Sequence, residues 1–512
     1  MRYALAVCTL VLLLAGCAVN PVTGRNELAL VGEDTELRAG AQHYQPSRQM
    51  QGGDYRTHPQ VVAYVQQVGQ RLAAVSDRKL PYEFRVLNDS TPNAWALPGG
   101  KIAINRGLLV ELNNEAELAA VLSHEIVHAA ARHGAKGMER NLLLQGAVLA
   151  TGLAARNSEY AALATGGAAV GSQLIQQRYS RDAEREADAY GMRYMARAGY
   201  DPAAAIGLQQ TFVRLAKNQQ PDWLNGLFSS HPPSQERVEA NRQLATTLPK
   251  GGTLGEERYR QALAPLLADR EAYAAHDAGR KALQAKDTAK ALSLAEKALR
   301  LQPAEALFHG LRGDIRMAEK NPADAITNYD RAIAQDDGYF HYYLQRGLAK
   351  KALGQTSAAV ADLERSTALL PTAPAQQALG LVALQQGQRG KAKELFAAAA
   401  QSQSTIGQQA RQAYQRLDLP EQPQRYLTTA VGLDGKGQLV LRIRNDSSLN
   451  VRQIVCLLQF SDSRQRRQQR SLTLAEVLPA GQQHQLKTGI GPLDPATLKS
   501  LSVRVSQATL AD

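Results

Sequence analysis

The sequence predicts three folded parts in series: a mainly helical α+β domain with a small sheet, an α-helical solenoid, and a small all-β domain resembling a sandwich. Three observations lead to this prediction. Alternating runs at 82–88 and 101–105 precede long helices rich in Ala and Leu, a repeat begins near residue 272, and short β-type runs separated by turn residues follow Pro420. A chain of 512 residues is also too long for a single hydrophobic core. We expect the three parts at residues 17–250, 251–420 and 421–512.

The first residues resemble a bacterial lipoprotein signal. "MRYALAVCTLVLLLAGC" contains an early Arg2 and then an apolar run that is too short to span a membrane. The ending Leu-Ala-Gly-Cys resembles a lipobox, so we expect residues 1–16 to be removed as a signal peptide and Cys17 to become a lipidated first residue. Ala18 follows in place of the Asp that usually retains lipoproteins at the inner membrane. We therefore expect a periplasmic protein anchored to the outer membrane.

Charge and cysteine content narrow the classes of partner. The net charge is +12, but no nucleic-acid-binding motif stands out, and 5% aromatic residues are too few for base-stacking platforms. We expect no nucleic-acid partner, and adhesion to anionic membrane surfaces or acidic unfolded chains is the milder interpretation of the charge.

Cys8 lies in the signal and Cys17 is expected to carry lipid. Cys456, in an apolar strand-like run, is then left without an intrachain disulfide partner.

The stretch "SHEIVHAAARH" (residues 123–133) places two histidines on one helical face. His124 and His128 are one turn apart, so both imidazoles project the same way. Two neutral imidazoles can bind zinc, and the adjacent Glu125 can hold a water on the metal. His133 lies five residues past His128 and is expected to point elsewhere, at the surface or at the helix end. The pattern predicts a zinc site that still lacks a third ligand.

The predicted helix has recognisable ends. Asn114 can cap its first turn, with Glu117 three residues further on. Gly134 is expected to end it, because glycine adopts the left-handed conformation that closes many helices.

A second stretch, "YSRDAEREADAYG" (residues 179–191), offers the missing ligand. Glu184 and Asp188 are again one helical turn apart on one face, whereas Glu186 is turned nearly to the other side. One carboxylate can complete the metal site while the other hydrogen-bonds a ligand imidazole. Helical geometry alone does not choose between Glu184 and Asp188.

Taken in order, several motifs resemble those of the M48 zinc peptidases, over roughly residues 20–245. "NPVTGRNELALV" is similar to the first segment of secreted bacterial members, and "NAWALPGGKIAINRGLL" is similar to the strand region beside their active site. The H-E-x-x-H motif is His124, Glu125 and His128, and the E-x-x-x-D motif is Glu184 and Asp188. "SHPPSQER" resembles the later H-P-x-x-x-x-R segment, which contains His231 and Arg237.

The resemblance implies a zincin-like metallopeptidase fold that holds one Zn²⁺ per chain, with Glu184 as the third ligand. Glu125 then acts as general base and Asp188 as the partner of a ligand imidazole. His231 or Arg237 is expected to stabilise the tetrahedral oxyanion. Alternatively, His231 occupies the open zinc position and holds the enzyme latent. The sequence does not separate these two roles.

An apolar, Gly- and Ala-rich segment at residues 141–177 lies between the two metal-binding motifs. Each of its two apolar pieces falls short of a membrane span. A helical hairpin that packs over the site and contacts lipid is one interpretation, and simple core packing is the other.

Residues 272–404 contain four repeats of the tetratricopeptide (TPR) type. Glycines recur with spacings of 34, 34 and 33 residues at Gly279, Gly313, Gly347 and Gly380. Larger side chains recur sixteen positions later in three of the four repeats, at Tyr329, Leu363 and Phe396, with Ala295 in the first. We expect the small residues where the two helices of a unit cross closely and the larger ones in the next layer. The runs after residue 420 predict a small β-sandwich of about 90 residues.

These features together predict a zinc-dependent endopeptidase. The family resemblance implies hydrolysis of misfolded or stalled outer-membrane and periplasmic proteins, with the repeats recruiting clients or the β-barrel assembly machinery. The "WALPGGKIAI" strand, if at an edge, could pair with extended substrate backbone, which would favour unfolded chains. The rival hypothesis is a repeat-based chaperone or scaffold in which proteolysis is secondary or silenced.

Overall fold

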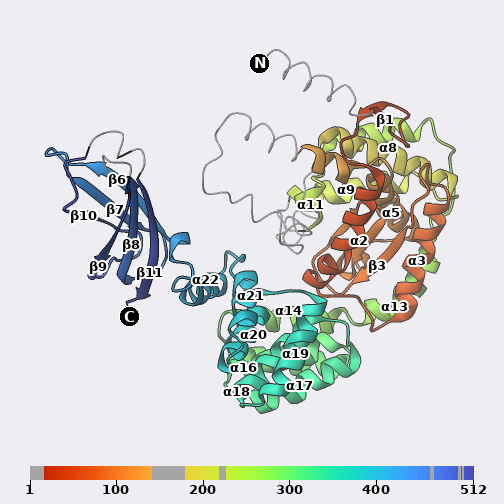
Figure 1. The fold of residues 1–512 in the computed structure, drawn as a ribbon. Coiled ribbons are helices and arrows are strands. Elements are labelled where there is room, and N and C mark those ends of the chain that lie inside the picture. Colours follow the sequence, from red (N-terminus) through yellow and green to blue (C-terminus); the bar gives the residue numbers. More distant parts are fainter. Residues whose placement is uncertain are drawn as a thin grey trace. The chain divides into compact units, whose positions relative to one another are not determined.

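The computed structural model describes residues 17–140, 179–217, 226–461, 466–493, 498 and 501–511 (Figure 1). The chain separates into two compact units, Met1–Leu370 and Pro371–Asp512. The predicted signal peptide at 1–16 and the apolar segment at 141–177 lie outside the described residues. Among the helices that are described, none combines the length and apolar character needed to cross a membrane.

The N-terminal part, residues 17–268, is an α+β structure built around one small sheet. Its strands are β1 (Cys17–Val19), β2 (Asn26–Leu28), β3 (Glu83–Leu87), β4 (Ala94–Leu97) and β5 (Lys101–Asn105). Its described helices are α2 (Glu33–Met50), α3 (Pro59–Ala74), α4 (Arg106–Leu109), α5 (Glu115–Ala130), α8 (Arg181–Arg197), α9 (Ala204–Lys217), α11 (Leu227–Ser230), α12 (Gln235–Ala245) and α13 (Glu256–Ala268).

The central sheet has the order β3-β5-β4. Strand β3 pairs parallel to β5, and β4 pairs antiparallel to β5, so β4 is an edge strand. Gly99 and Gly100 both have φ near +79°, which allows the tight turn from β4 into β5. The alternating runs at 82–88 and 101–105 form β3 and β5, as predicted.

Helices cover both faces of this sheet. Phe84, Ile102 and Ile104 point into the main hydrophobic core, which they share with buried residues of α3 and α5. The alternate residues Leu87 and Ala103 point to the opposite face and pack with Tyr44 of α2 and with residues of β4. Burial on both faces fixes the register of the strands and the position of α5 against the edge strand.

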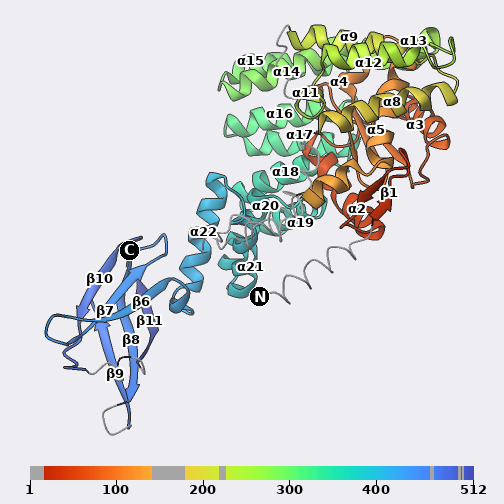
Figure 2. The ribbon, with the colours of Figure 1, turned by 90° about the horizontal axis from the view of Figure 1, so that it is seen from above.

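The repeats form pairs of helices, and the first three pairs belong to the first compact unit (Figure 2). Gly313 lies against the ring of Tyr329 and Gly347 against Leu363, which confirms that small residues mark the helix crossings. The helices of the first three pairs are α14 (Arg270–Gln284), α15 (Thr288–Leu301), α16 (Ala306–Ala318), α17 (Pro322–Gln335), α18 (Phe340–Ala352) and α19 (Thr356–Leu369).

The first repeats pack directly onto the N-terminal part. Tyr273 of α14 and Phe308 of α16 belong to the same hydrophobic core as α3 and α5. Glu305, only 1% exposed, accepts hydrogen bonds from Thr57 and Asn88 of the N-terminal part and from the Tyr273 hydroxyl. Apolar packing and a buried carboxylate therefore join the two segments.

The second compact unit combines helices with a β-sandwich. Its helices are α20 (Ala373–Gln385), α21 (Arg389–Ala399), α22 (Thr405–Asp418) and the short η2 (Pro423–Arg425). Its strands are β6 (Leu427–Leu433), β7 (Leu439–Asn445), β8 (Val451–Ser461), β9 (Arg467–Leu474), β10 (Gln483–Lys487) and β11 (Ser502–Leu510). They form two antiparallel sheets, β10-β7-β6 and β11-β8-β9, which bury a common core that includes Leu441 and Cys456. The predicted sandwich and the buried position of Cys456 are confirmed.

Candidate metal centre

Helix α5 carries the first two candidate ligands. The Asn114 side chain accepts from the backbone N–H of Glu117 at 2.8 Å, so the predicted N-cap is present. The helix ends at Ala130, and Arg132, with φ of +62°, takes the left-handed position that was expected of Gly134. The Nε2 atoms of His124 and His128 lie 3.0 Å apart on the same face.

Helix α8 brings the carboxylates to this face. The Ser180 hydroxyl caps the helix. Gly191 lies so close to α5 that an added Cβ would be 3.2 Å from the Ser123 hydroxyl oxygen and 3.3 Å from the backbone nitrogen of His124. This close approach places Glu184 beside both imidazoles: its Oε2 is 3.7 Å from His124 Nε2, and its Oε1 is 3.4 Å from His128 Nε2.

A third segment, which begins with α11, adds His231. Its Nδ1 lies 2.9 Å from Glu184 Oε1 and 3.3 Å from His124 Nε2. His124, His128, Glu184 and His231 thus offer one donor atom each, all within 4.8 Å of one another. In the part of the chain that is described, these four residues form the group of histidine, cysteine and carboxylate side chains that converges in this way.

The four donors fit a divalent metal ion. In a tetrahedral zinc site with bonds of 2.0–2.1 Å, neighbouring ligand atoms lie about 3.3 Å apart. Several pairs of these donors lie close to this value, at 3.0 Å for His124–His128, 3.3 Å for His124–His231 and 3.4 Å for His128–Glu184. All four donor atoms lie within 4.8 Å of one another. Burial holds the pKa of His128 well below its ordinary value, which keeps its imidazole neutral, as a ligand must be.

Asp188 supports His124 instead of joining the four donors. His124 Nδ1 donates to Asp188 Oδ1 at 3.0 Å, and Arg237 binds both oxygens of the same carboxylate at 2.7 Å each. Burial opposes ionisation of Asp188, but the charge and hydrogen bonds of Arg237 and the bond from His124 hold its pKa below its ordinary value. Arg237 Nη1 also lies 2.7 Å from Glu184 Oε2. The guanidinium therefore faces two carboxylates.

His133 lies just beyond the end of α5, which agrees with one of the two expected positions, but it is not at the surface. It is 4% exposed, and its Nδ1 lies 2.9 Å from His128 Nδ1, so the expectation that it points away from His128 is wrong. The reason is the left-handed Arg132, which turns the chain back toward α5 after the helix has ended. The ring of Tyr179, another residue that sequence analysis did not single out, stacks on His128 with centroids 3.9 Å apart.

Glu125 lies next to the four donors and is 1% exposed. Burial raises its pKa, and the nearby His231 and His124 only partly offset this effect. His231 Nε2 is 3.5 Å from Glu125 Oε1, and the backbone of Ala96, in the edge strand β4, hydrogen-bonds the same carboxyl group. The arrangement is a carboxyl group of raised pKa between a donor cluster and an edge strand.

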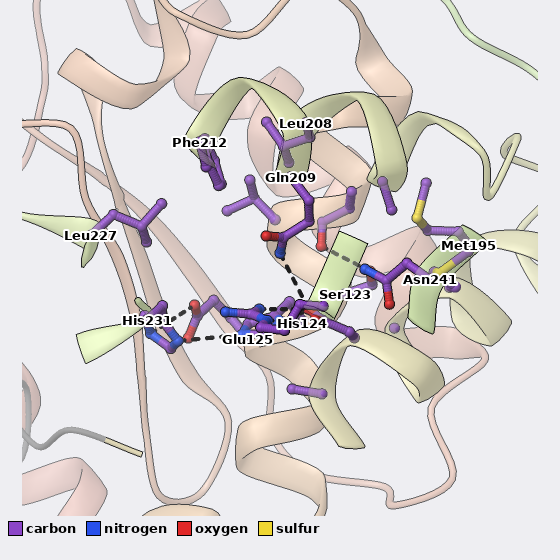
Figure 3. A pocket seen from close by; sticks show the side chains of 18 residues that line it. Ser123, His124, Glu125, Met195, Leu208, Gln209, Phe212, Leu227, His231 and Asn241 are labelled. Atoms are coloured by element: carbon purple, nitrogen blue, oxygen red, sulfur yellow. Dashed lines mark hydrogen bonds and ion pairs between the residues drawn. The ribbon is translucent and has the colours of Figure 1, made fainter. Parts of the chain in front are cut away.

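A cavity of about 40 Å³ opens beside His124 and Glu125 (Figure 3). Apolar side chains make most of its wall, and the buried amides of Gln209 and Asn241 face it together with His231. The apolar lining includes Met192, Met195, Leu208, Phe212 and Leu227.

Comparison with known families identifies the domain that holds this centre. The profile of peptidase family M48 matches residues 59–245, which include all four donors and Glu125. The chain carries an M48 metallopeptidase domain.

Three relatives illustrate the extent of the similarity. The "Putative beta-barrel assembly-enhancing protease" of Vibrio cholerae is 32% identical over 37% of this chain and 40% of its own length. The "Beta-barrel assembly-enhancing protease" of Yersinia pestis is 28% identical over 62% of this chain and 70% of its own length. The "Mitochondrial metalloendopeptidase OMA1" of Schizosaccharomyces pombe is 32% identical over 45% of this chain and 66% of its own length. The chain therefore spans only about two fifths of the Vibrio protein.

Among solved structures, the crystal structure of MamA protein is 24% identical over 29% of this chain and 81% of that chain, with a TM-score of 0.26. The Arabidopsis OM64 TPR domain is 22% identical over 23% of this chain and 98% of that chain, with a TM-score of 0.23.

Proposed function

We propose that the protein is a zinc-dependent endopeptidase whose metal is held by His124, His128 and Glu184. The observation that carries this proposal is the convergence of these donors beside the buried Glu125. Bound zinc would supply a water of lowered pKa and would polarise the scissile carbonyl. Glu125, whose pKa burial raises, is the general base that accepts a proton and returns it to the leaving amine.

In the arrangement described here, His231 supplies a fourth donor. Catalytic zinc sites keep one position open, whereas sites with four protein ligands are closed. We infer that this is a latent state, in which His231 fills the place that the attacking water or the substrate carbonyl requires. Movement of the segment around α11 then releases the enzyme. His231→Ala is expected to raise basal peptidase activity, and a fall would instead favour the oxyanion role for His231.

Arg237 acts in this proposal as a positioning residue. Its guanidinium is 6% exposed and already binds Asp188, Glu184 and the Pro232 carbonyl. A group with its donors engaged in this way is poorly placed to meet a developing oxyanion. We therefore propose that it holds the two carboxylates of α8 in place.

The edge strand and the cavity suggest how a substrate is held. Among the described residues, β4 lies at the edge of its sheet, and Ala96 within it already contacts Glu125. An extended peptide that pairs with β4 would bring its scissile bond to the centre, which favours unfolded chains. The mostly apolar wall of the cavity beside His124 and Glu125 would take an apolar side chain next to that bond.

The proposed clients are misfolded or stalled outer-membrane proteins in the periplasm. The chain is then anchored to the outer membrane through lipid on Cys17, and the helical repeats recruit clients or the β-barrel assembly machinery. Two observations support this proposal: two relatives are named beta-barrel assembly-enhancing proteases, and the repeats pack onto the peptidase domain through the buried Glu305.

Glu125→Gln tests the chemistry. The variant should keep its zinc but lose hydrolysis of casein and of a misfolded outer-membrane porin, because an amide cannot accept the proton. Glu239→Gln, an exposed change on α12, is the matched control and should behave as wild type. Equal degradation by wild type and Glu125→Gln would refute the enzymatic proposal.

The four-donor arrangement also favours a second candidate, a scaffold whose proteolysis is silenced. If porin assembly improves equally with wild type and with Glu125→Gln, the repeats act without hydrolysis. If only the wild type helps, the scaffold proposal fails.

A further inference from the structure

The imidazole of His128 has a buried partner on the side that faces away from the four donors. His128 Nδ1 lies 2.9 Å from His133 Nδ1, and His133 Nε2 lies 3.2 Å from Glu186 Oε1. Asn20 Nδ2 donates to the same Glu186 oxygen at 3.3 Å. His133 and Asn20 are 4% and 2% exposed, so water competes little for these contacts.

The contacts fix the direction of each hydrogen bond. The Glu186 oxygen accepts from Asn20 and also faces His133 Nε2, so that nitrogen must carry the hydrogen. A neutral His133 then has a bare Nδ1, which accepts from Nδ1–H of His128. The Nε2 of His128, which faces the other donors, is left with its lone pair free for a metal.

We propose that His133 and Glu186 are positioning residues for the metal ligand His128, joined in the order His128–His133–Glu186. This inference rests on the proposed zinc site and adds residues to it that no motif singles out. Partners of this kind fix the tautomer and orientation of a ligand imidazole and typically contribute 10- to 100-fold to metal affinity. The ring of Tyr179, stacked on His128, restricts the same imidazole from its face.

The series of contacts His128–His133–Glu186 continues into the N-terminal hairpin formed by β1 and β2. Asn20 follows β1 directly and also donates to both oxygens of Glu27 in β2. Lys136, just beyond His133, pairs with Glu27 at 2.7 Å. The hairpin that begins at Cys17 is therefore the outer support of the metal site, because its Asn20 is three contacts away from the ligand His128.

The two histidine ligands are thus supported in different ways. His124 donates straight to a carboxylate, Asp188, which Arg237 holds. His128 reaches its carboxylate, Glu186, only through the intervening imidazole of His133. The second arrangement depends on one additional side chain, that of His133. Substitution of His133 therefore tests the proposal.

The test measures Zn²⁺ affinity of the full-length protein by competition with a chelator, together with the absorption spectrum of the Co²⁺-loaded form. His133→Leu removes the acceptor for His128 and should weaken zinc binding about 10- to 100-fold and change the Co²⁺ spectrum. His133→Asn places an amide oxygen close to where Nδ1 lies and should restore most of the affinity. Glu186→Gln should give a smaller loss than His133→Leu.

His276→Leu is the matched control, because His276 is also buried and also bonded to a carboxylate, but lies in the repeats. It should leave both readouts unchanged. Thermal unfolding of the metal-free proteins shows which variants are folded. If His133→Leu does not fold, the zinc affinities of His133→Asn and Glu186→Gln are compared instead.

The outcomes separate the two proposals. Wild-type protein that binds no zinc would overturn the zinc site and this inference together. Folded His133→Leu that binds zinc as tightly as wild type, with an unchanged Co²⁺ spectrum, would overturn the positioning role alone. An equal loss in His133→Leu and His133→Asn would also overturn it, because the restored acceptor would then have no effect.

Discussion

The metal centre and the repeats both depend on close crossings of two helices, but different side chains fill the crossings. Between α16 and α17, Gly313 lies under the ring of Tyr329, and the contact is mostly apolar. Between α5 and α8, Gly191 allows a similar approach, yet the neighbouring space holds the carboxylates of Glu184 and Asp188.

The difference shows where stability and chemistry reside. Apolar crossings stabilise the fold through burial and close packing. Burying carboxylates costs desolvation energy that pairing offsets only in part. Substitutions at the metal centre should therefore change metal binding and rate much more than folding, and substitutions at the repeat crossings should do the reverse.

Glu184→Ala should have the largest effect. Loss of one of three protein ligands is expected to remove zinc and to lower peptidase activity at least about 1,000-fold, since the metal contributes several kcal/mol to the transition state. Elemental analysis and the rate of casein cleavage measure both. Zinc content equal to that of wild type would mean that the carboxylate is not a ligand.

Asp188→Asn should weaken zinc binding about 10- to 100-fold, because His124 keeps an acceptor but loses the charge that Arg237 fixes. Asp182→Asn, at an exposed position of the same helix, is the control. Chelator competition gives the affinity. If the two variants bind zinc equally well, the His124–Asp188 bond has no influence on the metal.

Gly313→Ala should destabilise the repeats by about 1–3 kcal/mol, because the new Cβ would lie 2.5 Å from Tyr329 Cε1. Gly279→Ala is the matched control: the nearest atom to its Cβ would be the flexible end of Leu311 at 3.1 Å, the next atoms lie at 3.4 Å, and helix propensity favours Ala. Denaturant unfolding followed by circular dichroism compares them. Equal stability of the two variants would contradict the predicted effect of the helix crossing. A change in the peptidase rate per folded molecule would contradict the prediction that repeat crossings affect only folding.

The smallest effect concerns pH. Burial tends to lower the pKa of His341, but the charge and hydrogen bond of Asp314 outweigh it, so the pKa of His341 is raised in the folded repeats. Its stabilising contribution is present below the unfolded pKa of about 6.5 and is lost as pH rises through the higher folded value. His341→Gln should remove that pH dependence. Thermal unfolding of both proteins across pH 5 to 9 measures it, and parallel curves would refute the pairing.

Local rules in the sequence were sufficient for much of this structure. Asn114 caps α5 as its spacing to Glu117 predicts, and the histidine pair one turn apart shares a face. Three of the four repeat glycines, Gly313, Gly347 and Gly380, meet the residues sixteen positions later, because both follow from helical periodicity within one unit.

The rest depends on how distant segments pack. Helical spacing left Glu184 and Asp188 equivalent, the family resemblance favoured Glu184, and the packing of α8 against α5 brings Glu184 among the four donors. His133 lies outside the helical phase of α5, so its return to His128 could not be read from spacing.

The buried Glu305 connects residues 17–268 to the start of the solenoid. Its carboxylate accepts hydrogen bonds from Thr57 and Asn88 of the N-terminal part and from Tyr273 of the first repeat. Removal of all residues from 270 onward would expose the apolar surface that Tyr273 and Phe308 now cover. It would also leave the Asn88 amide without its acceptor, the Glu305 carboxylate. Shortened forms that fold should therefore keep residues up to Leu370, where the first compact unit ends, and a fragment that ends before residue 270 should be insoluble.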